Sequence, residues 1–223
     1  MPIAATKSKP RPKRSRDPWE TRSRILDAAE ALVLTRGFSA TTVDEVCAGS
    51  GVTKGAFFHH FENKDAMFHE LLDRFAARNG GPLAGSIDPA GGKRPLERLD
   101  ALLDAIIRGN ESADIKGCLV GMASLELGLA DEAFRDRCGT LLGGFRSMVE
   151  KLLGEVGDEF PAVSDFNPEN LATQLLATLQ GAIVVGRATG DANTMRQAID
   201  EFRAGVKARV GCRQQIRKSE NET

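Results

Sequence analysis

The chain has 223 residues, of which 41% are hydrophobic and 27% are charged, a composition typical of a water-soluble globular protein with a sizeable core. No apolar run reaches the ~20 residues needed to span a bilayer, and no secretion signal opens the sequence, so a cytoplasmic location without membrane contact is expected. The four cysteines stand far apart, which argues against a structural zinc site and against a disulfide framework.

The net charge of -1 is distributed unevenly along the chain. Residues 1–64 hold 11 Lys/Arg against 7 Asp/Glu, a balance of +4, and the remaining 159 residues hold 19 against 24, a balance of -5. Residues 7–16 contain six basic residues and no acid. Such a run is either a solvated tail or an arm attracted to a polyanion, and residues 1–16 are predicted to form a disordered basic arm.

Helix signals begin at Asp17-Pro18, where Asp suits the N-cap and Pro the first turn. Apolar residues from Ile25 to Val33 then recur at helical spacing, which predicts one buried face. Gly37 is predicted to end this helix because glycine enters the left-handed cap conformation without steric cost.

Two short helices and a longer one are predicted next. Thr42 and Glu45 form a capping box at the start of a helix that is expected to stop at a four-residue turn, 48–51. Thr53 is predicted to cap a helix reaching about His59, and Asn63 to cap the following one. The predicted boundaries are a helix-turn-helix domain over 17–63 and a connecting helix over 64–79.

The rest of the sequence is predicted to be helical after one loop. Residues 80–95 contain five Gly and three Pro, which indicates a flexible loop. Helical periodicity then dominates and no sustained period-two alternation occurs, so the fold class is all-α. A helical bundle is predicted over 96–212, with a disordered tail over 213–223. Its helices are expected near 95–112, 117–129, 131–156, 168–190 and 193–212.

The two short helices, joined by a tight turn and preceded by a longer helix, form a helix-turn-helix arrangement. The DNA major groove, about 12 Å wide, admits one such helix while the other fixes its angle. The first turn of a helix offers unpaired N–H groups and a positive dipole end, which suit a phosphate. The side chains that strengthen such sites are Thr42, Thr53, Lys54 and Lys64, and Gly55 allows close approach of the backbone.

Residues 22–75, and especially the stretch GFSATTVDEVCAGSGVTKGAFFHHFENKDAMF, resemble the DNA-binding domain of the TetR/AcrR family of one-component transcriptional regulators. The similarity covers about a quarter of the chain and includes Gly-Phe at 37–38, Ala-Thr-Thr at 40–42 and the aromatic-His-Phe ending with a Lys three residues on. It implies a homodimeric repressor that binds a palindromic or near-palindromic operator and is released by a small-molecule effector. The N-terminal three-helix DNA-binding domain would be joined to a C-terminal bundle for effector binding and dimerisation.

The resemblance also implies roles for individual residues. Thr42 and Lys64 should bind phosphates, while the start of the second short helix should lie at the groove. That start comprises Thr53, Lys54, Gly55 and Ala56, of which Lys54 is expected to make the main base or phosphate contact. Phe58 stands where members commonly carry a tyrosine, and it is expected to pack on a sugar or a thymine methyl.

The adjacent His59 and His60 align with family positions that contact DNA. DNA contact is favoured for His59, whereas a structural role is favoured for His60 because its neighbour Phe61 is expected to be buried; His60 is kept among the candidate DNA contacts. A metal site that adds His69 is disfavoured, since adjacent residues on a helix point about 100° apart.

The C-terminal region offers a candidate dimer surface. Residues 170–186 carry no charge over some five turns, and the polar residues within the run argue against a membrane span. A helix that is uncharged all round is buried on more than one side, against its own core and against a second subunit. Dimerisation is predicted through Leu175, Leu179, Ile183, Phe202 and Val206, and a wholly intramolecular core helix is the alternative.

The effector pocket is a further implication of the resemblance. Apolar candidates for its lining are Leu103, Ile107, Met122, Phe145 and Met148, which plain core packing explains equally well. Cys118 is expected at a helix start after Lys116-Gly117, where the helix dipole favours a thiolate. The segment GCLVGMASLE resembles that of a family branch that includes sensors of reactive electrophiles, so redox or electrophile sensing by Cys118 is an alternative; an inert buried cysteine is another.

Enzymatic activity is not predicted. The sequence has no phosphate-cradling glycine motif, no nucleophile elbow and no paired metal-binding set, and no cofactor is expected. An architectural DNA-binding protein without an effector is a further alternative, although it would not need about 140 residues of apolar helical bundle.

Overall fold

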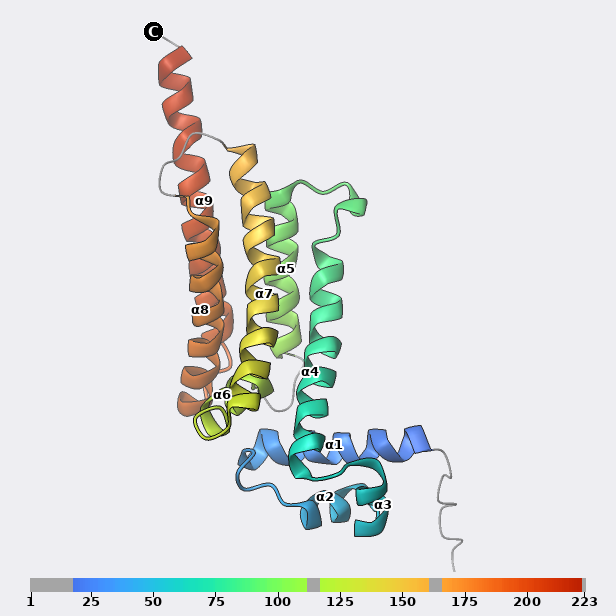
Figure 1. The fold of residues 1–223 in the computed structure, drawn as a ribbon. Coiled ribbons are helices and arrows are strands. Elements are labelled where there is room, and N and C mark those ends of the chain that lie inside the picture. Colours follow the sequence, from blue (N-terminus) through green and yellow to red (C-terminus); the bar gives the residue numbers. More distant parts are fainter. Residues whose placement is uncertain (1–17, 112–116, 161–165, 222–223) are drawn as a thin grey trace, which may run out of the picture.

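The computed structural model describes residues 18–111, 117–160 and 166–221, with side chains described as far as Val210. Within these ranges the fold is helical and has no β-strand, which confirms the all-α prediction (Figure 1). The predicted basic arm and the Asp17 N-cap lie outside the described residues. The helices are α1 (Pro18–Arg36), α2 (Val43–Ser50), α3 (Lys54–His60), α4 (Lys64–Ser86), a 3-10 turn η1 (Pro89–Gly91), α5 (Pro95–Glu111), α6 (Leu119–Glu126), α7 (Glu132–Glu159), α8 (Pro168–Thr189) and α9 (Thr194–Asn221).

The helices form a small unit at one end of an elongated bundle. In Figure 1, α1 lies across the lower end of α4, and α2 and α3 lie beneath it. From there α4 rises alongside α5 and α7, and α8 and α9 complete the bundle on the opposite side. The short helix α6 lies at the end of the bundle nearest α1, so the small unit contacts the bundle through both α4 and α6.

The capping residues read from the sequence are confirmed. Thr42 and Glu45 make both bonds of the capping box of α2. The side chain of Thr53 accepts the N–H of Ala56 at the start of α3, and Asn63 accepts that of Ala66 at the start of α4. These local bonds satisfy N–H groups that the first helical turn leaves unpaired, and they fix where each short helix begins.

The predicted end of α2 is wrong by three residues, because the turn was expected to begin at residue 48. α2 continues through Ser50, whose hydroxyl donates to the Val46 carbonyl at 2.6 Å, and ends at Gly51 with φ 66°. Only the last residue of the predicted turn adopts the left-handed conformation, because glycine carries no Cβ that would oppose it.

The flexible loop predicted over 80–95 is also wrong in its first half. α4 continues to Ser86 through Gly80, Gly81 and Pro82, residues of low helix propensity. Leu83 and Ile87 pack against the hydrophobic core of the bundle, and this burial outweighs the weak local preference. The tail predicted to be disordered over 213–223 is likewise helical as far as Asn221, in a stretch without Gly or Pro beyond residue 211.

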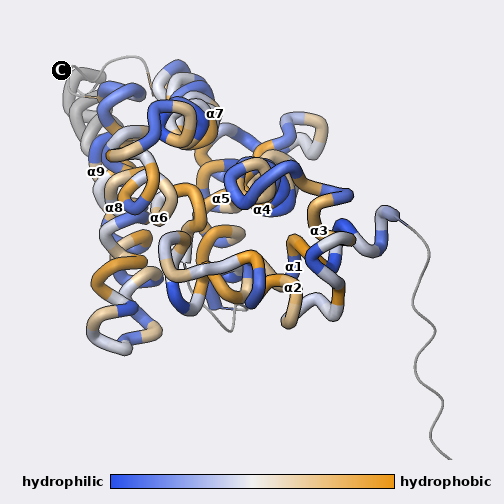
Figure 2. The backbone as a smooth tube through the Cα atoms, turned by 60° about the horizontal axis from the view of Figure 1, so that its bottom comes forward, coloured by the Kyte–Doolittle hydropathy of each residue, from blue (hydrophilic) through white to orange (hydrophobic). Residues whose placement is uncertain are grey.

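Two separate hydrophobic clusters hold the molecule together. Figure 2 colours the backbone by hydropathy and shows hydrophobic and hydrophilic residues alternating along the helices. The first joins α1–α4 to α6 and to the first turns of α7, through Phe134 and Cys138. The second joins α5, the later turns of α7, α8 and α9. The DNA-binding unit predicted from the sequence therefore shares its core with two elements of the C-terminal region.

By length and composition alone, α8 could cross a membrane, and among the described residues it is the single helix that meets this test. Core helices pass the same test, and α8 has a core face. Its buried residues are Leu171, Ala172, Leu175, Leu179 and Ala182, and they pack against α7 and α9.

Candidate nucleic-acid interface

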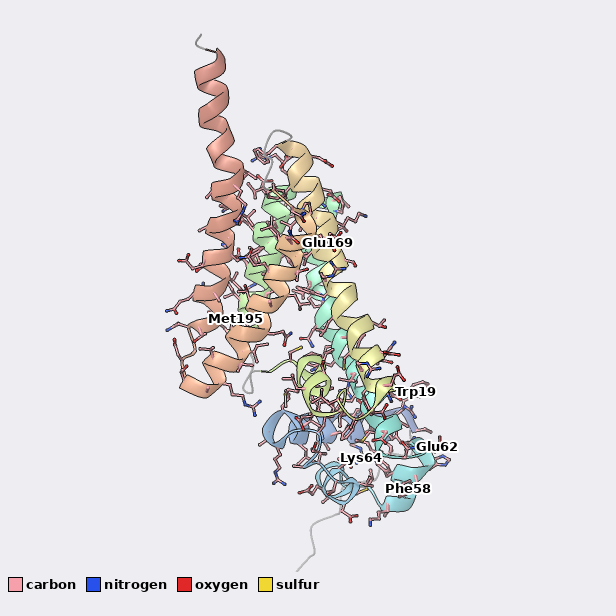
Figure 3. All side chains as sticks on the ribbon, turned by 60° about the vertical axis from the view of Figure 1, so that its left-hand side comes forward. Trp19, Phe58, Glu62, Lys64, Glu169 and Met195 are labelled. Atoms are coloured by element: carbon pink, nitrogen blue, oxygen red, sulfur yellow. The ribbon has the colours of Figure 1, made fainter. Side chains whose placement is uncertain are left out.

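The helix α3 exposes one face and buries the other. Phe57 is fully buried and lies against Phe61, with ring centroids 5.6 Å apart. Phe58, whose ring meets that of Phe57 edge-on at 5.2 Å, is 53% exposed. In Figure 3, Phe58, Glu62 and Lys64 lie together at the end of the molecule formed by α2, α3 and the start of α4.

The predicted DNA contacts fall on this one surface. Thr53, Lys54, Gly55, Phe58 and His59 are exposed on α3. Ala56 and His60 are half-buried, as is Lys64 at the start of α4, and Thr42 is exposed at the start of α2. The nine residues therefore share the end of the molecule away from the bundle.

Several of the predicted contacts already have intramolecular partners. The Thr42 hydroxyl donates to Glu45 Oε2 at 2.9 Å and accepts the Glu45 N–H at 3.3 Å. Hydrogen bonds from the Thr42 side chain and backbone, with Arg36 nearby, lower the pKa of Glu45. Lys64 Nζ lies 3.4 Å from the Thr41 carbonyl and over the Phe68 ring. A phosphate bound by Thr42 or Lys64 would either join these intramolecular bonds or replace them.

Lys54, the first residue of α3, pairs with a carboxylate of α2. Its Nζ lies 2.7 Å from Asp44 Oδ1, and both side chains are largely exposed. The hydrogen bond and the charge of Asp44 raise the pKa of Lys54, so the lysine is fully charged at neutral pH.

Arg22 of α1 holds the far end of α3 in place. Its guanidinium forms a bidentate pair with Glu70 of α4, donates to the His60 carbonyl at 2.8 Å and lies 4.5 Å from the Phe61 ring centroid. Burial, followed by the charges of His59 and Arg22, lowers the pKa of His60. Sequence reasoning missed Arg22, because its partners lie 38 or more residues away along the chain.

The segment that contains α1, α2 and α3 is not basic in composition. Residues 18–64 hold five Lys/Arg against six Asp/Glu, a balance of -1, so the +4 of residues 1–64 comes from the +5 of residues 1–17. Because non-specific affinity for DNA arises from neutralised phosphates, the helix-turn-helix unit supplies shape and positioned donors rather than bulk positive charge.

The residues predicted to bind an effector divide between the two cores. Leu103 and Ile107 are fully buried in the second cluster, with Phe145 and Met148 packed beside it. Cys118 and Met122 pack on the first cluster instead.

Two clefts open on the described surface. Met148 lines a cleft of about 500 Å³ between the end of α4, the start of α5 and α7, where Arg98 pairs with Glu155. A second cleft of about 410 Å³ lies between α1, α8 and α9, and its lining includes Leu34, Ile183, Arg187 and Met195.

Cys118 is half-exposed and serves as the N-cap of α6. Its Sγ accepts the Gly121 N–H at 3.4 Å. Cys138, in contrast, is buried, and its burial, followed by the proximity of Cys118, raises its pKa. Among the described residues, no group of three or more His, Cys, Asp or Glu side chains is placed to hold a metal ion.

Four of the five residues predicted to form the dimer contact lie in the core of the single chain. Leu175, Leu179, Phe202 and Val206 are at most 8% exposed, and Ile183 is half-buried. The outer face of α8 is formed by other residues that carry no charge. They include Ala177, Gly181, Val184, Val185 and Ala188, all exposed.

Three polar contacts join the DNA-reading unit to the bundle. The Ser39 N–H donates to Glu126 of α6 at 3.0 Å, and Arg187 of α8 donates to the Leu34 carbonyl at 3.0 Å. Arg137 of α7 donates through Nε to Asp73 of α4 at 2.6 Å. Bonds from α1, from the turn after it and from α4 therefore link the elements around α3 to three helices of the C-terminal region.

Comparison with known proteins finds a match for two parts of the chain. A family model described as bacterial regulatory proteins, tetR family, matches residues 25–71, and one described as tetracyclin repressor-like, C-terminal domain, matches residues 95–202. The chain is 29% identical over 181 residues to the HTH-type transcriptional repressor DhaR of Mycobacterium sp. (strain GP1), covering 81% of this chain and 87% of DhaR.

Solved structures share the fold. A TetR transcriptional regulator from Chloroflexus aurantiacus is similar with a TM-score of 0.76 at 23% identity, over 88% of this chain and 98% of that one. The reduced form of E. coli NemR is similar with a TM-score of 0.70 at 25% identity, over 82% of this chain and 95% of NemR.

Proposed function

We propose that this chain, which belongs to the TetR family of bacterial regulatory proteins, is a homodimeric transcriptional repressor that leaves its operator when a small molecule binds the helical domain. One observation carries the proposal. The family models account for both parts of the chain, and the first of them spans a short helix, α3, whose capped N-terminus and aromatic face are exposed.

α3 is the helix that we assign to the major groove. Thr53 stands at its positive end, where a phosphate is favoured, Lys54 is its main cation toward the groove, and Gly55 lets the backbone approach. Phe58 is suited to contact with a thymine methyl, and the exposed ring of His59 offers a donor to backbone or base. Thr42 and Lys64 flank this helix and are assigned to phosphates, which fix register without reading sequence.

We place the dimer contact on the outer face of α8. This face presents Ala177, Gly181, Val184 and Val185 without a charge, and small side chains allow two helices to pack closely. A two-fold dimer separates its recognition helices by about one turn of DNA, ~34–36 Å, or by a multiple of it. A palindromic or near-palindromic operator follows from that symmetry.

Release by an effector requires a site whose occupation moves α3. The cleft lined by Leu34 and Arg187 suits this purpose, because these two residues form the bond that joins α8 to α1. An apolar molecule seated there would compete with this bond. The cleft beside Met148 is the other candidate for the effector.

The test is in vitro selection of duplexes from a random library, followed by mobility-shift titration and sedimentation of the free protein. We expect enrichment of an inverted repeat, two chains per duplex and a dimer in solution. A monomer that enriches no sequence would overturn the proposal. A thermal-shift screen then separates an effector-controlled repressor from an architectural DNA-binding protein, because a ligand of the native state raises the melting temperature.

Thiol sensing through Cys118 is a second candidate, favoured by the position of its Sγ at the N-terminus of α6. The dipole of a helix stabilises a thiolate at that end. If the sensing proposal is right, N-ethylmaleimide should release the wild-type protein from DNA, and Cys118→Ser should remain bound. The matched control is Cys138→Ser, which removes a buried thiol and should respond as the wild type does.

A further inference from the structure

An acidic side chain stands in the surface that α3 presents. Asp44 is the second residue of α2, its side chain is 68% exposed, and its Oδ1 lies 2.7 Å from Nζ of Lys54. Lys54, 62% exposed, is the first residue of α3 and the main cation of the assigned DNA contact. A carboxylate at this point opposes the approach of a phosphate to the same lysine, and it is not the carboxylate that caps α2, because Glu45 completes the capping box.

We propose that Asp44 determines the specificity of DNA binding by withholding Lys54 from phosphates and keeping it for a base edge. The proposal rests on the function proposed above. An ammonium group has three donors, so Lys54 can hold Asp44 with one and donate to the O6 and N7 acceptors of a guanine with the others. To meet a phosphate on the rim of the groove, Lys54 must instead leave Asp44 unpaired in the field of the polyanion.

Asp44 therefore affects the affinity for DNA of arbitrary sequence differently from the affinity for the operator. Binding to DNA of arbitrary sequence depends almost entirely on phosphate contacts, and Asp44 weakens it. Binding to the operator uses base contacts as well, and there the Asp44–Lys54 pair is retained. The carboxylate thus increases the ratio between the two affinities without touching a base.

Asp44→Asn tests the proposal, because it removes the charge and keeps the shape and the hydrogen-bonding capacity. The probes are a random-sequence duplex and the duplex that the wild-type protein enriches from a random library. On the random duplex we expect binding about three- to tenfold tighter at moderate salt, with a salt dependence steeper by about 0.9 in the logarithmic slope. On the enriched duplex we expect a change below about twofold, so that the specificity ratio falls.

Two further variants serve as controls. Asp158→Asn removes the same charge at the exposed C-terminal end of α7 and should leave both affinities unchanged. In a Lys54→Gln background, Asp44→Asn should no longer discriminate between the two duplexes, because the residue acts through Lys54.

The proposal is overturned if Asp44→Asn leaves the random-sequence affinity and its salt slope at wild-type values. It is equally overturned if the substitution tightens both duplexes by the same factor. A wild-type protein that binds DNA but enriches no duplex counts against the proposed repressor function instead, and the random-sequence measurement with Asp44→Asn still decides whether Asp44 restrains Lys54.

Discussion

The two hydrophobic cores divide the molecule differently from its sequence. The family models separate residues 25–71 from 95–202, whereas the first core joins α1–α4 to α6 and the start of α7. The second core holds α5, the later turns of α7, α8 and α9. Because close-packed interiors transmit strain, a shift of α6 or of the start of α7 must be accommodated by the DNA-reading helices. The packing boundary, rather than the boundary between sequence domains, is therefore where a signal from the bundle would enter.

Two substitutions on α7 separate these cores and should have the largest effects. Phe134→Ala empties a site in the first core and Leu153→Ala one in the second, and both residues are at most 2% exposed. We expect losses of about 3–5 and 2–5 kcal/mol in the free energy of unfolding, respectively. Phe134 also stacks on His69 of α4, with ring centroids 4.0 Å apart.

Hydrogen exchange on each variant identifies which helices loosen. Phe134→Ala should speed exchange in α1–α4, and Leu153→Ala in α5, α8 and α9, although both lie on one helix. DNA binding should fall more with Phe134→Ala. The same pattern of exchange in both variants would mean that the chain has one cooperative core.

Sequence patterns located the elements whose ends are set by local chemistry. Thr42 with Glu45, Thr53 and Asn63 each bond an N–H within three residues, so a capping residue at the right spacing was sufficient to predict them. Gly37, with φ 90°, ends α1 as predicted for the same reason.

Features set by distant contacts could not be predicted in this way. α4 runs through Gly80, Gly81 and Pro82 because Leu83 and Ile87 pack, partly buried, against a core formed later in the chain. Distant contacts also decide which residues of α8 are covered by α7 and α9. The dimer prediction named residues of α8 that these helices cover. Leu175 and Val184 have similar hydropathy, and only packing distinguishes them.

The next largest expected effect is a loss of DNA affinity on deletion of the N-terminal arm. It follows from the difference in charge between this arm and the helix-turn-helix unit. Residues 1–16 contain six basic residues and no acid, whereas residues 18–64 carry a balance of -1. Deletion of residues 1–16 should weaken binding to any duplex about 100-fold at moderate salt and reduce the logarithmic salt slope by up to about 5. Mobility-shift titrations over a range of salt concentrations measure both. An unchanged slope would mean that the arm is a solvated tail.

The contact between α6 and the turn after α1 provides a smaller, sharper test of how the two regions are joined. Gly37 has φ 90°, and a Cβ there would lie 2.7 Å from Glu126 Oε1. Gly37→Ala should therefore cost about 1–3 kcal/mol, through backbone strain and displacement of the Glu126 carboxylate from the Ser39 N–H.

The double-mutant cycle with Glu126→Ala separates these two costs. Against that background Gly37→Ala should retain the cost of backbone strain and lose the cost of displacement. Additive losses would show that Glu126 moves aside freely and that the Ser39–Glu126 bond does not couple the regions. Thermal or urea unfolding of the four proteins supplies the measurement.

The smallest expected effect is the pH dependence that His60 gives to the DNA-reading unit. Burial, followed by the charges of His59 and Arg22, lowers its pKa below the ordinary value of about 6.5, so the folded chain takes up this proton later than the unfolded chain. The stability associated with neutral His60 is therefore complete above about pH 6.5 and is lost as the pH falls through that value toward the folded pKa. His60→Asn should reduce the fall in melting temperature between pH 7.5 and 5.5. Identical slopes for the variant and the wild type would show that His60 is not held neutral by its surroundings, and would assign the acid sensitivity of this unit to other groups.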